Sequence, residues 1–136
     1  MRQVSRPVIP LGATGTQSVV VTRDLTVAHY RPGLPEAYGT PLMIYLMEVA
    51  AGAAIEPYLA EGWASVGVAV NVQHLAATPV GRTVTATATV TAVDDKTVTF
   101  DVTAHDGIEP IGRGTHVRAP IELARFNARL EAKARR

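Results

Sequence analysis

The sequence predicts an α+β fold in which a curved antiparallel sheet wraps around one central helix. The segment from Leu42 to Leu59 consists of good helix formers and is apolar on every face, which is typical of a helix buried on all sides. A β-rich segment precedes it, and from Thr83 to Pro120 polar and apolar residues alternate in three successive strands. An antiparallel meander with one apolar face can bury such a helix.

The length of the chain, 136 residues with a mass of 14.4 kDa, predicts a single domain over residues 1–136. A chain of this size buries about two thirds of its unfolded surface, which is enough for a core. There is no cysteine, so disulfides, a thiol nucleophile and cysteine-ligated zinc or iron–sulfur sites are excluded.

The elements before the central helix are the least regular. Residues 1–16 are rich in proline and glycine and are expected to form an irregular lead-in. Residues 17–21 and 25–30 are rich in strand formers and predict a first strand or a bent pair. The prolines and glycine at 31–35 then interrupt regular structure, and the helix begins at Thr40-Pro41, with Thr40 as the expected N-cap.

Four strands are predicted after the helix. Val66 to Val72 alternates with a period of two, and the same alternation places His74 on the inward face of the valines at 66, 68, 70 and 72. Residues 83–92 interleave threonines with small apolar residues, residues 98–104 continue after a turn at 94–96, and residues 108–120 form the last strand after the Asp106-Gly107 turn.

A C-terminal helix is predicted over residues 121–136, because Leu123, Phe126 and Leu130 recur at helical spacing. Its basic residues Arg125 and Arg129 lie on one face with Lys133. We interpret that face as a solvated helix edge rather than a phosphate-binding surface.

The charge balance bears on partners and location. Thirteen basic and twelve acidic residues leave a net charge of +1, which argues against nucleic acid or a membrane as the main partner. The chain shows no signal-peptide pattern, and its longest apolar run, Leu42 to Ile55, is short and contains Glu48. We therefore expect a cytoplasmic protein. Only 18% of the residues are charged and 47% are hydrophobic, which predicts a homodimer or higher homo-oligomer.

Glu48 is the first candidate for chemistry, because it is the one residue in that apolar run that is charged at neutral pH. A carboxylate there is costly unless it faces a partner or a cleft. One interpretation is structural: Glu48 reaches a helix edge or satisfies a buried backbone donor. The other is a base or nucleophile with an affinity for protons tuned by its apolar setting.

Histidines are the second candidates. His74 is either a hydrogen-bonded core residue or a general acid or base. His105 and His116 lie near predicted turns in segments expected to be exposed, and we interpret both as structural. The sequence holds no His-x-x-x-His pair and no dense carboxylate cluster, so we expect neither a metal site nor a cofactor.

Thr40 and Glu48 cannot bond to each other directly. They are eight residues apart, which on a regular helix is about 12 Å of rise. If Thr40 is more than a cap, the outward-pointing amides of the helix start can hold an oxyanion there. Either a long substrate then spans the gap, or one of the two residues comes from another subunit.

Several motifs, taken in order, resemble one family over about residues 17–131. They are Thr40-Pro41-Leu42-Met43 with Glu48, residues 72–81 (Val-Gln-His-Leu-Ala-Ala-Thr-Pro-Val-Gly), residues 104–107 (Ala-His-Asp-Gly), residues 111–116 (Ile-Gly-Arg-Gly-Thr-His) and Arg118. The sequence resembles the hot-dog-fold thioesterases, in particular the fluoroacetyl-CoA thioesterase-like group. That resemblance implies a sheet wrapped around a helix, side-by-side dimers, and hydrolysis of CoA thioesters at the subunit interface without metal.

The resemblance also implies roles for individual residues. It makes Thr40, Glu48 and His74 catalytic, and it makes Gly67 and Arg118 substrate-binding. Two features depart from the family: Val117 replaces an acidic residue before Arg118, and residues 31–35 lack the phenylalanine that forms a lid over the fluoroacetyl group. The expected discrimination for fluoroacetyl is therefore weak.

The hypothesis drawn from the sequence is an acyl-CoA thioesterase acting on a small-molecule thioester, in which Glu48 either attacks the carbonyl or activates water. Two alternatives stay open at this stage. One is an enoyl-CoA hydratase or dehydratase, since a carboxylate and a histidine can also move protons at the α and β carbons. The other is a non-catalytic acyl-CoA-binding protein.

Overall fold

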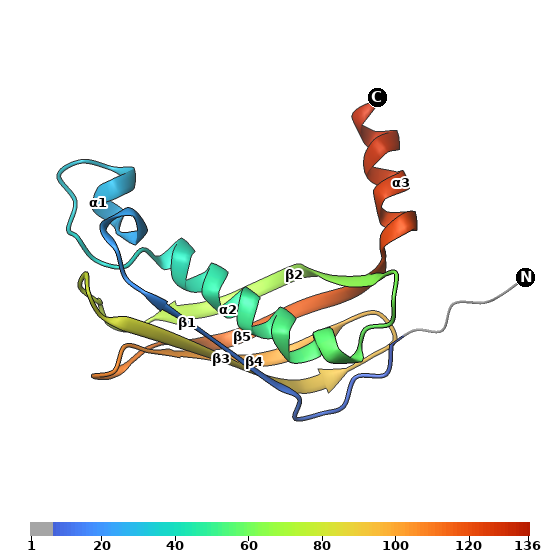
Figure 1. Ribbon diagram of the computed structural model, residues 1–136, viewed down its shortest axis with the longest axis horizontal. Helices are drawn as coiled ribbons and strands as arrows, with labels where there is room; N and C mark the ends of the chain where they lie inside the picture. The colour runs from blue at the N-terminus through green and yellow to red at the C-terminus, as the bar shows by residue number, and fades with distance from the viewer. Residues whose placement is uncertain (1–6) are drawn as a thin grey trace, which may run out of the picture.

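A computed structural model describes residues 7–136 and confirms the predicted α+β architecture (Figure 1). Short helical segments accompany the main elements at Arg23–Leu25 (η1), Val27–Tyr30 (α1) and Glu56–Tyr58 (η2). The main elements, in chain order, are β1 (Thr14–Val20), α2 (Thr40–Ile55), β2 (Trp63–His74), β3 (Thr83–Val93), β4 (Val98–His105), β5 (Pro110–Glu122) and α3 (Leu123–Ala134).

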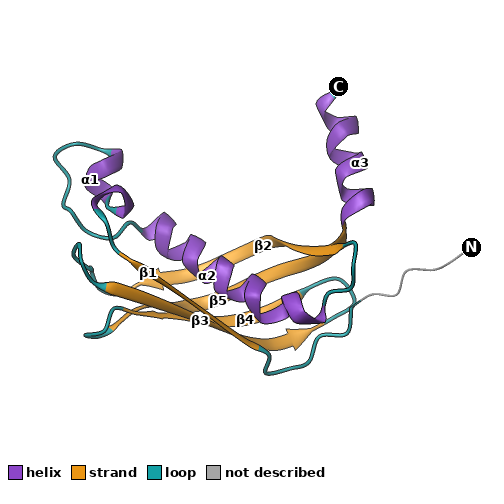
Figure 2. Cartoon of the chain, viewed as in Figure 1, coloured by secondary structure: helices purple, strands orange, loops and turns teal. Residues whose placement is uncertain are grey.

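The five strands form one antiparallel sheet in the order β1-β3-β4-β5-β2. The sheet curves around α2, which lies along its concave side (Figure 2). In the described part of the chain, β1 and β2 are the edge strands, each with a neighbour on one side only.

The core forms where α2 meets the sheet. Met43, Met47 and Ala50 of α2 are buried against sheet residues that include Phe100 and Ala88. Contact is close because small residues lie at the crossing points: a Cβ atom on Gly15 of β1 would stand 2.6 Å from the backbone nitrogen of Ala54. Such a separation is impossible for a real side chain, so the sequence needs glycine there.

The first elements differ from the prediction. β1 begins at Thr14 rather than after residue 16, and residues 25–30 are largely helical instead of forming a strand. The amide of Thr26 bonds back to the carbonyl of Arg23, and the amide of Ala28 bonds to Pro35, so this segment satisfies its backbone locally. Residues 1–6 of the expected lead-in lie outside the described residues.

The helix boundaries also shift. α2 ends at Ile55 and a short 3-10 turn follows, because Pro57 cannot donate the next helical hydrogen bond. α3 begins at Leu123 rather than 121, since residues 121 and 122 still pair with β2. It extends away from the sheet with no buried residue (Figure 1). Within residues 7–136 no helix is long and apolar enough to cross a membrane, and the cytoplasmic location stays a prediction.

A β-bulge at Val68 changes which residues of β2 face the helix. Gly67 pairs with Arg118, and Ala69 pairs with the next residue, Val117, so Val68 is an extra residue without a partner on β5. The simple alternation of the sequence is therefore wrong here: Val66 and Val68 do not share a face with His74. Val68 is 58% exposed, whereas Gly67 and His74 both contact residues of α2.

A buried carboxylate secures the loop that precedes α2. The hydroxyl of Thr78 donates to Asp106 Oδ2 at 2.9 Å, and the amides of Ile108 and Glu109 donate to Oδ1 at 3.0 Å. The carbonyl of Thr78 in turn accepts from the amide of Tyr38 at 2.9 Å. Burial opposes ionisation of Asp106, but the three hydrogen bonds outweigh it and hold its pKa below the usual value.

We predict that Asp106→Asn lowers the free energy of unfolding by about 1.5 to 3 kcal/mol at neutral pH, because the hydrogen bonds lose their charged acceptor. A carboxyl group with a lowered folded pKa stabilises the fold above its unfolded pKa of about 4, and this contribution disappears as the pH falls through the folded pKa. Urea unfolding should therefore show that the difference in free energy of unfolding between Asp106→Asn and wild type becomes smaller in acid. The same substitution at exposed Asp101, Asp101→Asn, is the control. A difference in free energy of unfolding between Asp106→Asn and wild type that grew in acid would contradict the prediction.

Candidate active site

The hydroxyl of Thr40 and the ring of His74 form one cluster, at the start of α2 and the end of β2. Thr40 is the first residue of α2 and Gly39 is the N-cap, so the expected capping role of Thr40 is wrong. Its side chain points to β2 instead, and Oγ1 lies 2.7 Å from His74 Nδ1. Both residues line a cavity of about 370 Å³ together with Val27 and Tyr38.

The ring of His74 is set up to act as a neutral hydrogen-bonding group. Burial lowers its pKa below the usual value, which favours the uncharged imidazole at neutral pH. If Thr40 donates to Nδ1, the hydrogen of the ring lies on Nε2. In residues 7–136 Nε2 is buried and has no hydrogen-bond partner, so a hydrogen bond to this atom would offset the cost of burying it.

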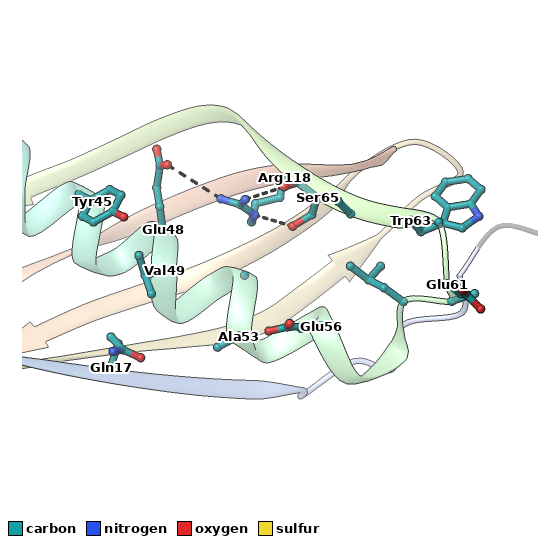
Figure 3. A pocket seen from close by; sticks show the side chains of 15 residues that line it. Gln17, Tyr45, Glu48, Val49, Ala53, Glu56, Glu61, Trp63, Ser65 and Arg118 are labelled. Atoms are coloured by element: carbon teal, nitrogen blue, oxygen red, sulfur yellow. Dashed lines mark hydrogen bonds and ion pairs between the residues drawn. The ribbon is translucent and has the colours of Figure 1, made fainter. Parts of the chain in front are cut away.

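Glu48 lies two turns further along α2, in a second cavity of about 730 Å³ (Figure 3). Its carboxylate points toward β2 and β5, with Oε2 4.0 Å from Arg118 Nη1. The side chain is 36% exposed, so it reaches the cavity and does not satisfy a buried backbone donor. Tyr45, Ser65 and Trp63 line the same space.

Arg118 of β5 is held firmly beneath this carboxylate. Its side chain is only 12% exposed. Nε donates to the hydroxyl of Ser65 and Nη2 to the carbonyl of Ser65, both at 2.9 Å (Figure 3). Burial lowers the pKa of the guanidinium and the charge of Glu48 opposes this shift, but arginine keeps its proton at neutral pH.

His116 contradicts its expected exposure. It is 1% exposed, and its ring stacks on Phe100 with centroids 6.0 Å apart. Nδ1 lies 2.8 Å from the carbonyl of Ala69, and Nε2 lies 3.3 Å from Arg118 Nη1. Its pairing with inward-facing Phe100 across the β4–β5 hairpin is the signal that could have located it. His105 is exposed, as predicted, and accepts from the amide of Gly107.

Gly67 leaves open the β2 side of the Glu48 carboxylate. A Cβ atom at this position would lie 3.4 and 3.5 Å from the two carboxylate oxygens of Glu48 and 3.5 Å from His116 Cε1. These are ordinary contact distances, so the fold tolerates a methyl group there. A methyl would, however, cover one face of the carboxylate.

The predicted residues therefore form two clusters within one chain. The first contains Thr40 and His74, and the second contains Glu48, Gly67 and Arg118. Thr40 and Glu48 are separated by about 12 Å of helix rise, and Gly67 and His74 by about 20 Å along β2. Sequence reasoning missed two members of the second cluster, Ser65 and His116.

Comparison with known proteins identifies the family. Residues 21–124 match the FlK family, described as fluoroacetyl-CoA-specific thioesterases. The chain belongs to this family. A fluoroacetyl-CoA thioesterase of Streptantibioticus cattleyicolor is 43% identical over 129 residues, which cover 90% of this chain and 93% of that relative.

Solved structures support the same assignment. A fluoroacetyl-CoA thioesterase of the FlK family superimposes with a TM-score of 0.86 at 42% identity, covering 93% of this chain and 98% of that one. A thioesterase superfamily member from Thermus thermophilus gives 0.88 at 28% identity, covering 94% and 95%. The chain is thus a hot-dog-fold thioester hydrolase of the acyl-CoA thioesterase class, as its motifs implied, and the hydratase and non-catalytic alternatives find no support.

Proposed function

We propose that the protein hydrolyses small acyl-CoA thioesters at sites shared between the two subunits of a homodimer. Each site joins Thr40 and His74 of one protomer to Glu48, Gly67 and Arg118 of the other. The observation that carries this proposal is the bulged edge strand β2, which bears Gly67 and His74 on the same face but seven residues apart.

A second copy of the chain suits the outer edge of β2. In residues 7–136 this edge has no strand partner, and Val70 beside it is 39% exposed. Unpaired strand edges favour pairing with another strand. Two β2 strands that pair antiparallel about a two-fold axis near Val70 and Asn71 bring the His74 end of one close to the Gly67 end of the other.

The reaction needs water and the side chains of these two clusters, and the proposal includes no metal or cofactor. Glu48 either attacks the thioester carbonyl to form an acyl-enzyme that water then hydrolyses, or takes a proton from the attacking water. In both routes the C–S bond breaks, CoA leaves as its thiolate and the acyl group leaves as the free acid. Arg118, beside Glu48, stabilises the negative charge of the carboxylate.

His74 and Thr40 orient the reacting groups. Because burial favours the neutral ring of His74, we assign its Nε2–H to a hydrogen bond with the thioester carbonyl or the attacking water. The hydroxyl of Thr40 fixes the ring through the 2.7 Å contact with Nδ1. Such oriented donors stabilise the oxyanion that forms as the carbonyl is attacked.

We predict that Glu48→Gln lowers kcat by about 100-fold or more while the protein stays folded, because the amide keeps the shape but is neither a nucleophile nor a base. Thiol release from acetyl-CoA measures the loss. Glu56→Gln is the matched control, since Glu56 lines the same cavity from an exposed position outside the proposed cluster. Unchanged thiol release by Glu48→Gln would refute the mechanism.

The shared site predicts complementation between two inactive variants. In a heterodimer of Glu48→Gln and His74→Ala subunits, one of the two sites contains an intact Glu48 and an intact His74. Random exchange of equal amounts should therefore restore about one quarter of the wild-type activity. A site contained within one chain would restore none. Sedimentation of the wild type checks the dimer itself, and an active 14.4 kDa monomer would exclude a shared site.

Selectivity for fluoroacetyl is expected to be weak. Two of the relatives are fluoroacetyl-CoA thioesterases, but the loop at 31–35 of this chain has no aromatic residue, and its Leu34 is 41% exposed. We predict a kcat/KM ratio for fluoroacetyl-CoA over acetyl-CoA that does not exceed about 200, the upper value of one hydrophobic contact. Leu34→Phe is the matched variant that should raise the ratio. A wild-type ratio far above 200 would show that another element of the structure provides the selectivity for fluoroacetyl.

A further inference from the structure

We infer that His116 is a positioning residue, which holds the guanidinium of Arg118 so that it stabilises Glu48 without binding its carboxylate directly. This inference rests on the role proposed for Glu48. The residues of the second cluster are oriented by one another, and His116 is the member whose contacts fix the orientation of Nη1, the nitrogen that faces the carboxylate.

The hydrogen bonds of His116 permit only one state of its ring. The carbonyl of Ala69 can only accept, so Nδ1 must carry a hydrogen and donate across 2.8 Å. Arg118 can only donate, so Nε2 must present its lone pair to Nη1 at 3.3 Å. The ring is therefore neutral, with its hydrogen on Nδ1. Burial lowers the pKa of His116 and the charge of Arg118 adds to this shift, while the hydrogen bond to Ala69 and, less strongly, the charge of Glu48 oppose it only in part.

The surroundings of the ring keep it in place. His116 lies on β5 between paired strands, opposite Phe100 of β4 and Val70 of β2. Its plane lies within 26° of the plane of Phe100. The Val68 bulge interrupts the ladder next to Ala69, and the carbonyl of Ala69 accepts from the imidazole. A ring held in this way cannot follow Arg118 if the guanidinium moves.

The consequence concerns the carboxylate of Glu48. Ser65 holds Nε and Nη2 of Arg118, and His116 holds Nη1, so the guanidinium has a partner on each nitrogen. Nη1 stays 4.0 Å from Glu48 Oε2, which is beyond hydrogen-bond distance. Without the acceptor on His116, Nη1 would be free to close onto the carboxylate, and the oxygen atoms needed for attack or proton transfer would become occupied.

Two substitutions separate this role from simple packing. Asparagine at 116 can place an amide nitrogen near the position of Nδ1 and donate to Ala69, but it offers no acceptor at Nε2. Glutamine can extend its amide oxygen to that acceptor position. Both substitutions remove the aromatic ring, so the two variants lose similar packing and each serves as the packing control for the other. Their melting temperatures measure how much stability this loss costs.

We expect His116→Gln to keep kcat within about threefold of wild type and His116→Asn to lose about 10-fold or more, with KM changed little, because reactive groups lose rate steeply when displaced. In an Arg118→Ala background the two substitutions should give equal kcat, because the residue through which His116 acts is gone. The inference would be overturned if His116→Gln and His116→Asn had equal kcat with Arg118 present. It would also be overturned if the difference in kcat between them were the same in the Arg118→Ala background.

A measurement on the wild-type protein does not depend on the folding of variants. Nitrogen NMR of labelled histidine should show the His116 ring neutral at neutral pH, with its hydrogen on Nδ1. A hydrogen on Nε2, or a charged ring, would overturn the inference. This test uses no substrate, so its failure is distinct from retained activity of Glu48→Gln, which would refute the proposed function instead.

Discussion

The β-bulge at Val68 is the constraint on which the site depends. Without the extra residue, strict alternation would put Gly67 and His74 on opposite faces of β2. With it, Gly67 faces Glu48 and His74 faces Thr40, both toward α2. The same bulge lies beside Ala69, whose carbonyl holds His116. One inserted residue therefore sets the geometry of both clusters, which is a common use of bulges near functional sites.

Close packing of the helix on the sheet sets the distances. Gly15 and Gly112 let β1 and β5 approach α2 where any side chain would collide with the helix backbone or with Met43. Since α2 cannot move outward without opening the core, the positions of Thr40 and Glu48 relative to β2 are fixed. The polar side chains of α2 lie outside its apolar contact with the sheet, at the first residue of the helix and along the side that faces the cavity beside Arg118.

The charged cluster is stable because each buried polar atom has a partner. Arg118 is removed from water, yet Ser65 and His116 accept its hydrogen bonds and Glu48 supplies a nearby negative charge. Two ring nitrogens are exceptions in residues 7–136: His74 Nε2 and Trp63 Nε1 are buried without a hydrogen-bond partner. A buried polar atom of this kind carries a free-energy cost, and a substrate or a second subunit that meets it removes that cost.

The sequence alone determined the fold class and pointed to most of the candidate site residues, because helix periodicity, strand alternation and short motifs are local. Glu48 stood out as one charge in an apolar run, and the ordered motifs identified the thioesterase family. Tertiary structure alone decided that Thr40 bonds His74 rather than capping its helix, that His116 is buried, and that two clusters exist. These facts depend on a bulge and on strand register, which arise from pairing between segments far apart in the chain.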